Sequence, residues 1–344
     1  MISSLHAFRA RGVVRILVTA VAAALACAAT AQARPVRIKL ATLAPSGTSF
    51  HLTLQEMAAK WKAAPDGGVP LTIFPDGRMG GESDMVRRMR TNQLQAGLLT
   101  VSGISDIEFA VAGLQNMPMA FRSLEEAAWV RERLQPTYEK ALAEKGFIVL
   151  GWFDSGWVQV FSKNPIETPE QMKGEKVFVL ASSPASAEIA RSFGMTPVPL
   201  EPTDILLSLQ TGQISAVTAP PFYALASQFH RTAPHMLEIN WSPLVGGLVV
   251  TRAAWEQLSP GQQQVLRTSG AEACAKILVA ARKEMADSVE AMRAQGMSVH
   301  SIGGEHEEEW RAFAETILPK TRGTIVPEQA WDEIMGLIKE YRAR

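Results

Sequence analysis

The sequence has few of the residues from which catalytic and metal sites are built. It contains only two cysteines and six histidines in 344 residues. No G-x-S-x-G, P-loop or H-E-x-x-H motif is present. Five of the histidines are scattered without a metal-ligand spacing: His51, His230, His235, His300 and His306. We therefore expect no enzyme activity, no cofactor and no metal site.

The sequence also lacks an excess of charge of either sign. Lysine plus arginine and aspartate plus glutamate both number 34, so the formal net charge is zero. A neutral chain gives no electrostatic reason to expect binding to nucleic acid or to an anionic membrane. Cysteine is equally scarce, because Cys27 falls in the amino-terminal leader described next and only Cys274 remains. An internal disulfide is thereby excluded, and the helical context of Cys274 favours a small buried residue.

One apolar run stands out, near the amino terminus. Three arginines precede the run at 16–29, which is followed by an Ala-x-Ala cleavage pattern ending at Ala33. These features predict a signal peptide over residues 1–33 and export to the periplasm, since the run is too short for a spanning helix. A lipoprotein site at Cys27 is the weaker alternative, because Leu25 lies one place too close to that cysteine.

The stretch 172–221 alternates strand and helix patterns. An apolar run at 176–180 predicts a buried strand, and a helix opened by Ser183 and Pro184 ends at Gly194. A second helix and strand follow over 203–218. A similar unit occurs at 83–96, which aligns with 203–216 and keeps Asp, Thr, Gln and Ala at matching positions. Two such units about 120 residues apart predict two α/β lobes with a ligand cleft between them.

A long helical pattern begins at Ser259-Pro260, an N-cap followed by proline at the first helical position. Its apolar residues keep helical spacing up to Gly296. The alternative is two helices separated near Ser269-Gly270. We expect a first lobe of residues 34–155 plus 245–284 and a second lobe of residues 156–244 plus 285–344. The carboxy-terminal helices are expected to pack on the second lobe.

The motifs of the two units resemble those of a known family. MKGEKVFV, FGMTPVPL and LQTGQISAV occur in this order, after IKLAT near residue 38 and FPDGRMGGESDMVRRM. Together they resemble the substrate-binding proteins of tripartite ATP-independent periplasmic (TRAP) transporters, DctP type. The resemblance implies an α/β, type II-like periplasmic-binding-protein clamshell. It also implies two mixed sheets flanked by helices, with a long helix spanning both lobes.

The ligand site that the resemblance implies departs from the family pattern. The strand after the Lys-Gly motif normally carries an arginine that pairs with a ligand carboxylate, and Phe178 stands there instead. The second basic position of the family falls on Val158, beside Trp157. The expected asparagine falls on Ala219. The two remaining positions, both in the first lobe, fall on Val101 and Leu43.

Without the arginine, the site gains apolar and aromatic character. Trp157, Phe178, Phe222 and Trp241 are the aromatic residues that we expect to line the cleft. Such a cleft suits a hydrophobic or weakly polar ligand better than a small carboxylate. In the alternative, Phe178 turns into the core and a base reaches the ligand from elsewhere. The candidates for that base are Arg191, Lys176 and Arg78. Trp152 favours a core position in its strand.

The resemblance implies a monomeric periplasmic receptor that captures a small-molecule ligand and delivers it to the small and large membrane subunits of a TRAP-type system. The lobes would close around the ligand because the ligand binds the closed state more tightly. Three alternatives stay open: a receptor for a small organic acid that uses relocated charges, a stand-alone periplasmic lipid carrier, and an enzyme built on the same fold, which the sequence gives no reason to expect.

Overall fold

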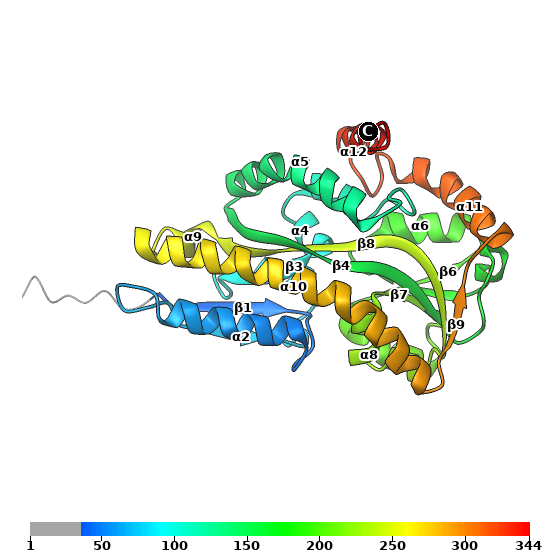
Figure 1. Cartoon of the computed structure of the whole chain (residues 1–344), viewed down its shortest axis with the longest axis horizontal. Coiled ribbons are helices and arrows are strands. Elements are labelled where there is room, and N and C mark those ends of the chain that lie inside the picture. The colour runs from blue at the N-terminus through cyan, green and yellow to red at the C-terminus, as the bar shows by residue number, and fades with distance from the viewer. Residues whose placement is uncertain (1–35) are drawn as a thin grey trace, which may run out of the picture. The chain divides into compact units, whose positions relative to one another are not determined.

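Two long antiparallel strands form the centre of the structure. In the computed structural model, which describes residues 36–344, β4 (Phe147–Ser162) pairs with β8 (His235–Thr251) along most of its length. Both are about three times the usual strand length. Their register shifts at three places, one of them between Asp154 and Trp157. The two strands run side by side through the middle of the molecule in Figure 1.

The remaining strands add to this pair on either side. The strand order is β2-β1-β3-β8-β4-β7-β5-β6, and β9 also pairs with β8. The expected two mixed sheets are therefore joined by β4 and β8 into one hydrogen-bonded path. The bounds are β1 (Ile38–Thr42), β2 (Leu71–Phe74), β3 (Ala96–Thr100), β5 (Lys176–Leu180), β6 (Thr196–Leu200), β7 (Ala216–Ala219) and β9 (Ser298–Ser301).

The repeated unit of the sequence folds the same way twice. Helix α3 (Glu82–Arg90) leads into β3, and α7 (Ile205–Thr211) leads into β7. Both links contain a residue in the left-handed conformation: Asn92 has φ 58° and Gly212 has φ 74°. These residue types tolerate that conformation with little strain, so each helix ends and the chain enters a buried strand directly.

Helix α10 (Pro260–Ala294) is continuous over 35 residues, or about 53 Å. The alternative of a break near Ser269-Gly270 is wrong. A side-chain carbon at Gly270 would lie 2.7 Å from Leu150 Cβ, so the missing side chain lets the helix approach β4 closely. Ser269 Oγ meanwhile accepts a hydrogen bond of 2.9 Å from the Trp61 indole. The helix packs against α2, β4 and α8, and so spans both lobes.

The helix α12 (Glu328–Arg342) packs against α5 (Leu124–Glu144) and the 3₁₀ helix η1 (Phe109–Leu114), in the first lobe (Figure 1). Our expectation that the whole carboxy-terminal segment packs on the second lobe is wrong for this helix. The Arg342 guanidinium donates to the Glu126 carboxylate at 2.7 Å. Buried apolar residues of α12 also join the core beneath α5. Helix α11 (Glu305–Thr321) stays with the second lobe, where Trp310 is buried.

Opposite faces of β4 are covered by different helices. Val149 packs in the core formed with α5 and α12, whereas its neighbour Leu150 packs in the core formed with α2 and α10. This alternation is the normal consequence of the strand period of two. The other helices are α2 (Ser49–Lys62), α4 (Val101–Ser105), α6 (Pro184–Ser192), α8 (Pro221–Ala226), α9 (Arg252–Trp255), η2 (Pro169–Met172), η3 (Pro202–Asp204) and η4 (Phe229–Arg231).

Among residues 36–344, no helix has the length and apolarity that crossing a membrane requires. The predicted signal peptide, with its cleavage after Ala33, lies outside the described residues. Four buried apolar clusters form the cores, two mainly in the first lobe and two in the second, and Phe222 of α8 joins one of the first-lobe clusters. We keep the remaining lobe boundaries, at residues 155 and 244 on the paired strands, as a proposal.

Candidate ligand-binding cavity

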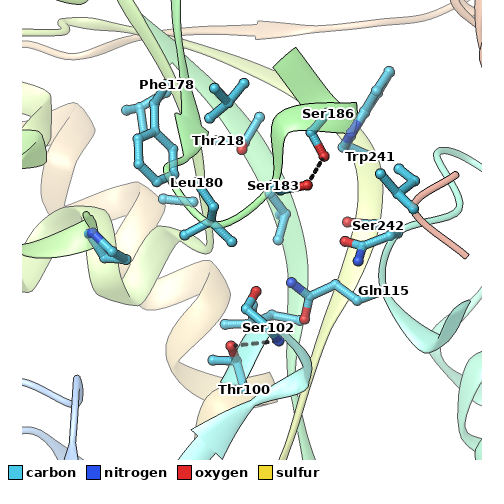
Figure 2. Close-up of a pocket in the computed structure, with 18 of the residues that line it drawn as sticks. Thr100, Ser102, Gln115, Phe178, Leu180, Ser183, Ser186, Thr218, Trp241 and Ser242 are labelled. Carbon is cyan, nitrogen blue, oxygen red and sulfur yellow. Dashed lines mark hydrogen bonds between the residues drawn. The ribbon is translucent and has the colours of Figure 1, made fainter. Parts of the chain in front are cut away.

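A cavity of about 570 Å³ lies between the two lobes. Its volume falls within the range typical of sites for small organic ligands. The end of β3, α4 and η1 supply its wall from the first lobe, and β5, α6, β7 and α8 supply the wall from the second. In Figure 2, Phe178 lies across the cavity from Gln115 and Ser242.

The charged side chains in the described lining of the cavity are all acidic. Glu82, Asp106 and Glu201 line it, but no lysine, arginine or histidine among the described residues does. The three bases that we considered as alternative carboxylate partners, Arg78, Lys176 and Arg191, are absent from the lining. Nothing in this wall offers the charged pairing that a carboxylate ligand normally requires.

Glu82 is a structural carboxylate at the edge of the cavity. It is buried and accepts hydrogen bonds from Thr100 N at 2.7 Å, Thr100 Oγ1 at 2.6 Å and Gly103 N at 2.9 Å. Burial raises its pKa, although these three hydrogen bonds act in the opposite direction. The carboxylate thus fixes the turn between β3 and α4, where two backbone N–H groups would otherwise lack partners.

Glu201 reaches from the second lobe toward the first. A side chain at Gly81, the N-cap residue of α3, would collide with the Glu201 carboxylate, so the glycine permits this close approach. The pKa of Glu201 is raised by burial first and then by three neighbouring carboxylates. These belong to Asp84, Asp204 and Asp106. The lobes therefore meet here through like charges, which increases the negative potential beside the cavity.

Aromatic and aliphatic side chains form most of the remaining wall. Phe50 and Phe222 stack with ring centroids 4.7 Å apart, and Phe50 also meets the edge of Phe153 at 5.9 Å. Phe178 is half-buried and packs against the core formed by β7 and α7. Trp241 stands edge-on to Trp310 at 6.3 Å. All of these residues line the cavity, which offers a ligand a large apolar surface.

The polar groups of the wall are mostly uncharged. Ser183 and Ser186 share a hydrogen bond of 2.6 Å, drawn in Figure 2, and so satisfy each other. Gln115 accepts a hydrogen bond from Val245 N at 3.3 Å through its amide oxygen. The Ser155 hydroxyl differs from these, because it is buried and no described residue lies within hydrogen-bonding distance of it.

Of the eight residues predicted to bind ligand, six line the cavity: Leu43, Val158, Phe178, Ala219, Phe222 and Trp241. Val101 and Trp157 do not. Val101 is the first residue of α4 and is completely buried in the core of the first lobe. Trp157 follows the register shift of β4 and packs in the same core. An irregularity of this kind re-aims the side chains after it, and the local sequence pattern signals it only weakly.

The sequence analysis missed several residues that line the cavity, including Gln115, Ser155, Glu82 and Glu201. Ser155-Gly156 breaks an apolar strand pattern, which is a weak signal of a bulge. Gln115, Glu82 and Glu201 lie in loops and on helices whose orientation the sequence pattern does not determine. Trp152 is buried as expected, with its indole N–H donating to Glu139 Oε1 at 3.1 Å.

The comparison with protein families is decisive for the class of protein. A family model described as bacterial extracellular solute-binding protein, family 7, matches residues 40–322. The chain belongs to this family. Its members are periplasmic solute-binding components of TRAP-type transport systems, and they are transport proteins, not enzymes. In the described part of this family 7 protein, no group of three or more potential metal ligands occurs.

Two relatives illustrate the ligands associated with similar sequences. The 2,3-diketo-L-gulonate-binding periplasmic protein of Escherichia coli is 26% identical over 232 residues, which cover 65% of this chain and 69% of that protein. The C4-dicarboxylate-binding periplasmic protein of Rhodobacter capsulatus is 22% identical over 310 residues, or 87% and 90% of the two chains. The ligands for which these two relatives are named are organic acids.

Solved structures agree with the two-lobed fold. The sugar-acid-binding protein of Advenella mimigardefordensis, in complex with galactonate, superposes with a TM-score of 0.82 at 16% identity. The match covers 89% of this chain and 99% of that one. A TRAP periplasmic solute-binding protein of Shewanella oneidensis with bound succinate gives a TM-score of 0.81 at 17% identity, covering 89% and 100%. At 16% and 17% sequence identity, the similarity to these two structures shows a shared fold.

Proposed function

We propose that this protein captures an uncharged, largely apolar ligand between its lobes and delivers it to the membrane subunits of a TRAP-type transporter. The observation that carries the proposal is the charge of the cavity wall, which has three carboxyl groups and no base among the described lining residues. The aromatic lining supplies the apolar surface that such a ligand would bury.

Electrostatics argue against a small carboxylate as the ligand. A charge-assisted hydrogen bond contributes about 1.5–3 kcal/mol, so losing an arginine partner weakens carboxylate binding by roughly 10- to 100-fold. Asp106 and Glu201 would add repulsion to that loss, since both line the same cavity. Glu82 adds less, because Thr100 and Gly103 donate three hydrogen bonds to its carboxyl group.

Transport follows from closure of the lobes. The ligand stabilises the closed state by contacting both walls at once, and the closed form docks on the small and large membrane subunits. Closure would bend the chain where β4, β8 and α10 cross between the lobes. The sequence carries no nucleotide-binding P-loop, so the energy for transport comes from the partner subunits.

The organic acids for which the two relatives are named favour a second candidate, a receptor for a small organic acid. That candidate requires a base near the ligand. We place it second because the only charged groups that line the cavity are acidic.

The test is native mass spectrometry of the mature protein isolated gently from the periplasm, followed by analysis of the released small molecule. An uncharged apolar compound supports the proposal. A copurified sugar acid or dicarboxylate would overturn it and would favour the second candidate. If the protein is isolated empty, calorimetric titration with decan-1-ol and with succinate decides between the two, because only the favoured class should bind.

A further inference from the structure

The Ser155 hydroxyl is a buried polar group without a protein partner. Its residue is 1% exposed, it lines the cavity, and its Oγ has no hydrogen-bond partner among residues 36–344. Burying a hydroxyl without a partner is unfavourable, and buried polar groups in folded proteins are nearly always hydrogen-bonded. Because the Ser155 hydroxyl lacks a hydrogen-bond partner in the protein and lines a ligand-sized cavity, it indicates that an atom of the bound ligand is the partner.

The fold positions this hydroxyl through the irregularity in β4. Asp154 pairs with Val245 and Trp157 pairs with Pro243, so the residues between them have no regular partners on β8. Gly156 has φ +81°, a conformation that favours glycine. Asp154, the preceding residue, does not line the cavity, and its carboxylate lies 3.4 Å from the Arg282 guanidinium.

Two uncharged polar side chains lie in the same part of the wall. Gln115 uses its amide oxygen to accept from Val245 N, which leaves its amide N–H groups as donors. Ser242 lies on β8 opposite Val158 and also lines the cavity. Figure 2 shows both side chains across the cavity from Phe178. A ligand that fills the cavity thus meets neutral donors and acceptors at one end and an apolar wall at the other.

We propose that Ser155 hydrogen-bonds an uncharged oxygen, a hydroxyl or carbonyl group, at one end of the ligand, whose apolar body extends toward Phe178. This inference rests on the proposed function and deepens it, because it names the ligand class as a neutral molecule with one polar end. It also assigns Ser155 as a residue that determines specificity. A carboxylate at this end would meet hydroxyl and amide groups but no positive charge.

The test uses three probes of one chain length: decan-1-ol, decanoate and 1-chlorodecane. Each displaces the neutral dye N-phenyl-1-naphthylamine from the mature protein near neutral pH. In Ser155→Ala, decan-1-ol should bind about 2- to 12-fold more weakly, the effect of one neutral hydrogen bond. Binding of 1-chlorodecane to Ser155→Ala should stay within about twofold of binding to wild type, because this probe has no hydroxyl group that could bond Ser155.

The matched control is Ser186→Ala. This serine also lines the cavity, but its hydroxyl already bonds Ser183, so decan-1-ol binding should change little. The melting temperature of ligand-free Ser155→Ala should be unchanged or raised, because the substitution removes a hydroxyl that lacks a protein partner. A fall in that temperature would show that the hydroxyl has a structural partner, and it would overturn the inference.

The outcomes separate the inference from the function on which it rests. If wild type prefers decan-1-ol to decanoate but Ser155→Ala and Ser186→Ala bind the alcohol equally well, the inference fails and the proposed function stands. If wild type binds decanoate more tightly than decan-1-ol, the proposed function itself fails. An equal loss of 1-chlorodecane and decan-1-ol in Ser155→Ala would indicate a change of cavity shape and would also contradict the inference.

Discussion

Replacing Phe178 by arginine should strengthen the binding of small acids in the cavity. Phe178 lies on β5, lines the cavity and is only half-buried, so a longer charged side chain has access to the ligand space. The arginine would add the only base to a lining that holds three carboxyl groups. A planar guanidinium can pair with a ligand carboxylate through two hydrogen bonds.

The expected size of the effect follows from two opposing contributions: the new interaction with the acid and the lost burial of Phe178. One charge-assisted interaction contributes about 1.5–3 kcal/mol, which corresponds to roughly 10- to 100-fold tighter binding of an acid. Against this, losing about half of the burial of a phenylalanine lowers the free energy of unfolding by about 1–2 kcal/mol. The variant should therefore remain folded while its ligand preference reverses. Binding of decan-1-ol should weaken, because the apolar wall now carries a charge.

The assay is isothermal titration calorimetry with succinate and galactonate on wild type, Phe178→Arg and Phe178→Met. Methionine is unbranched and uncharged, so the comparison between the two variants isolates the charge. We expect tighter binding of the acids only in Phe178→Arg. The reasoning is refuted if a folded Phe178→Arg protein binds these acids no better than Phe178→Met. The reasoning is refuted equally if wild type binds succinate and galactonate as tightly as Phe178→Arg does.

Three further predictions concern stability and are measured by urea unfolding. Gly151→Ala should lower the free energy of unfolding by about 1–3 kcal/mol, because the new methyl group would lie 3.0 Å from Cys274 Sγ. The double variant Gly151→Ala, Cys274→Ala should recover part of this loss. Arg342→Ala should lower the free energy of unfolding by about 1.5–3 kcal/mol, because the buried Glu126 carboxylate loses its cation. Faster hydrogen exchange confined to α12 would show that the destabilisation is local to this helix. Because the folded state raises the pKa of Glu201 above its ordinary 4.5, this residue stabilises the fold below that pH, and the contribution is lost as pH rises through the higher folded pKa. Glu201→Gln should therefore lose less stability than wild type between about pH 4 and pH 7, and parallel pH profiles would contradict this.

Much of the fold could be predicted from the sequence. The internal repeat predicted two α/β units, and both form in the structure as a helix that leads into a strand. The spacing of apolar residues after Ser259 predicted the long helix, which is unbroken. These signals are local: a cap, a turn residue or a periodic stripe acts within a few residues and does not depend on the rest of the chain.

The candidate site could be predicted only in part. The position of Phe178 in a strand and at the cavity followed from its motif, and five more predicted residues share that cavity. Trp157 could not be placed, because an irregularity in β4 decides which face each later side chain takes. Val101 begins a helix where its side chain turns inward to the core. Binding by these residues stays a prediction.

By itself, the sequence determined the class of protein, the two repeated α/β units and the long helix after Ser259. Only the tertiary structure decided the placement of α12, the absence of a base among the described residues that line the cavity, and the lack of a hydrogen-bond partner for the Ser155 hydroxyl among residues 36–344. These three features depend on which distant segments meet. An apolar helix face can pack in more than one groove, and a polar side chain is satisfied or unsatisfied only once all of its neighbours are in place.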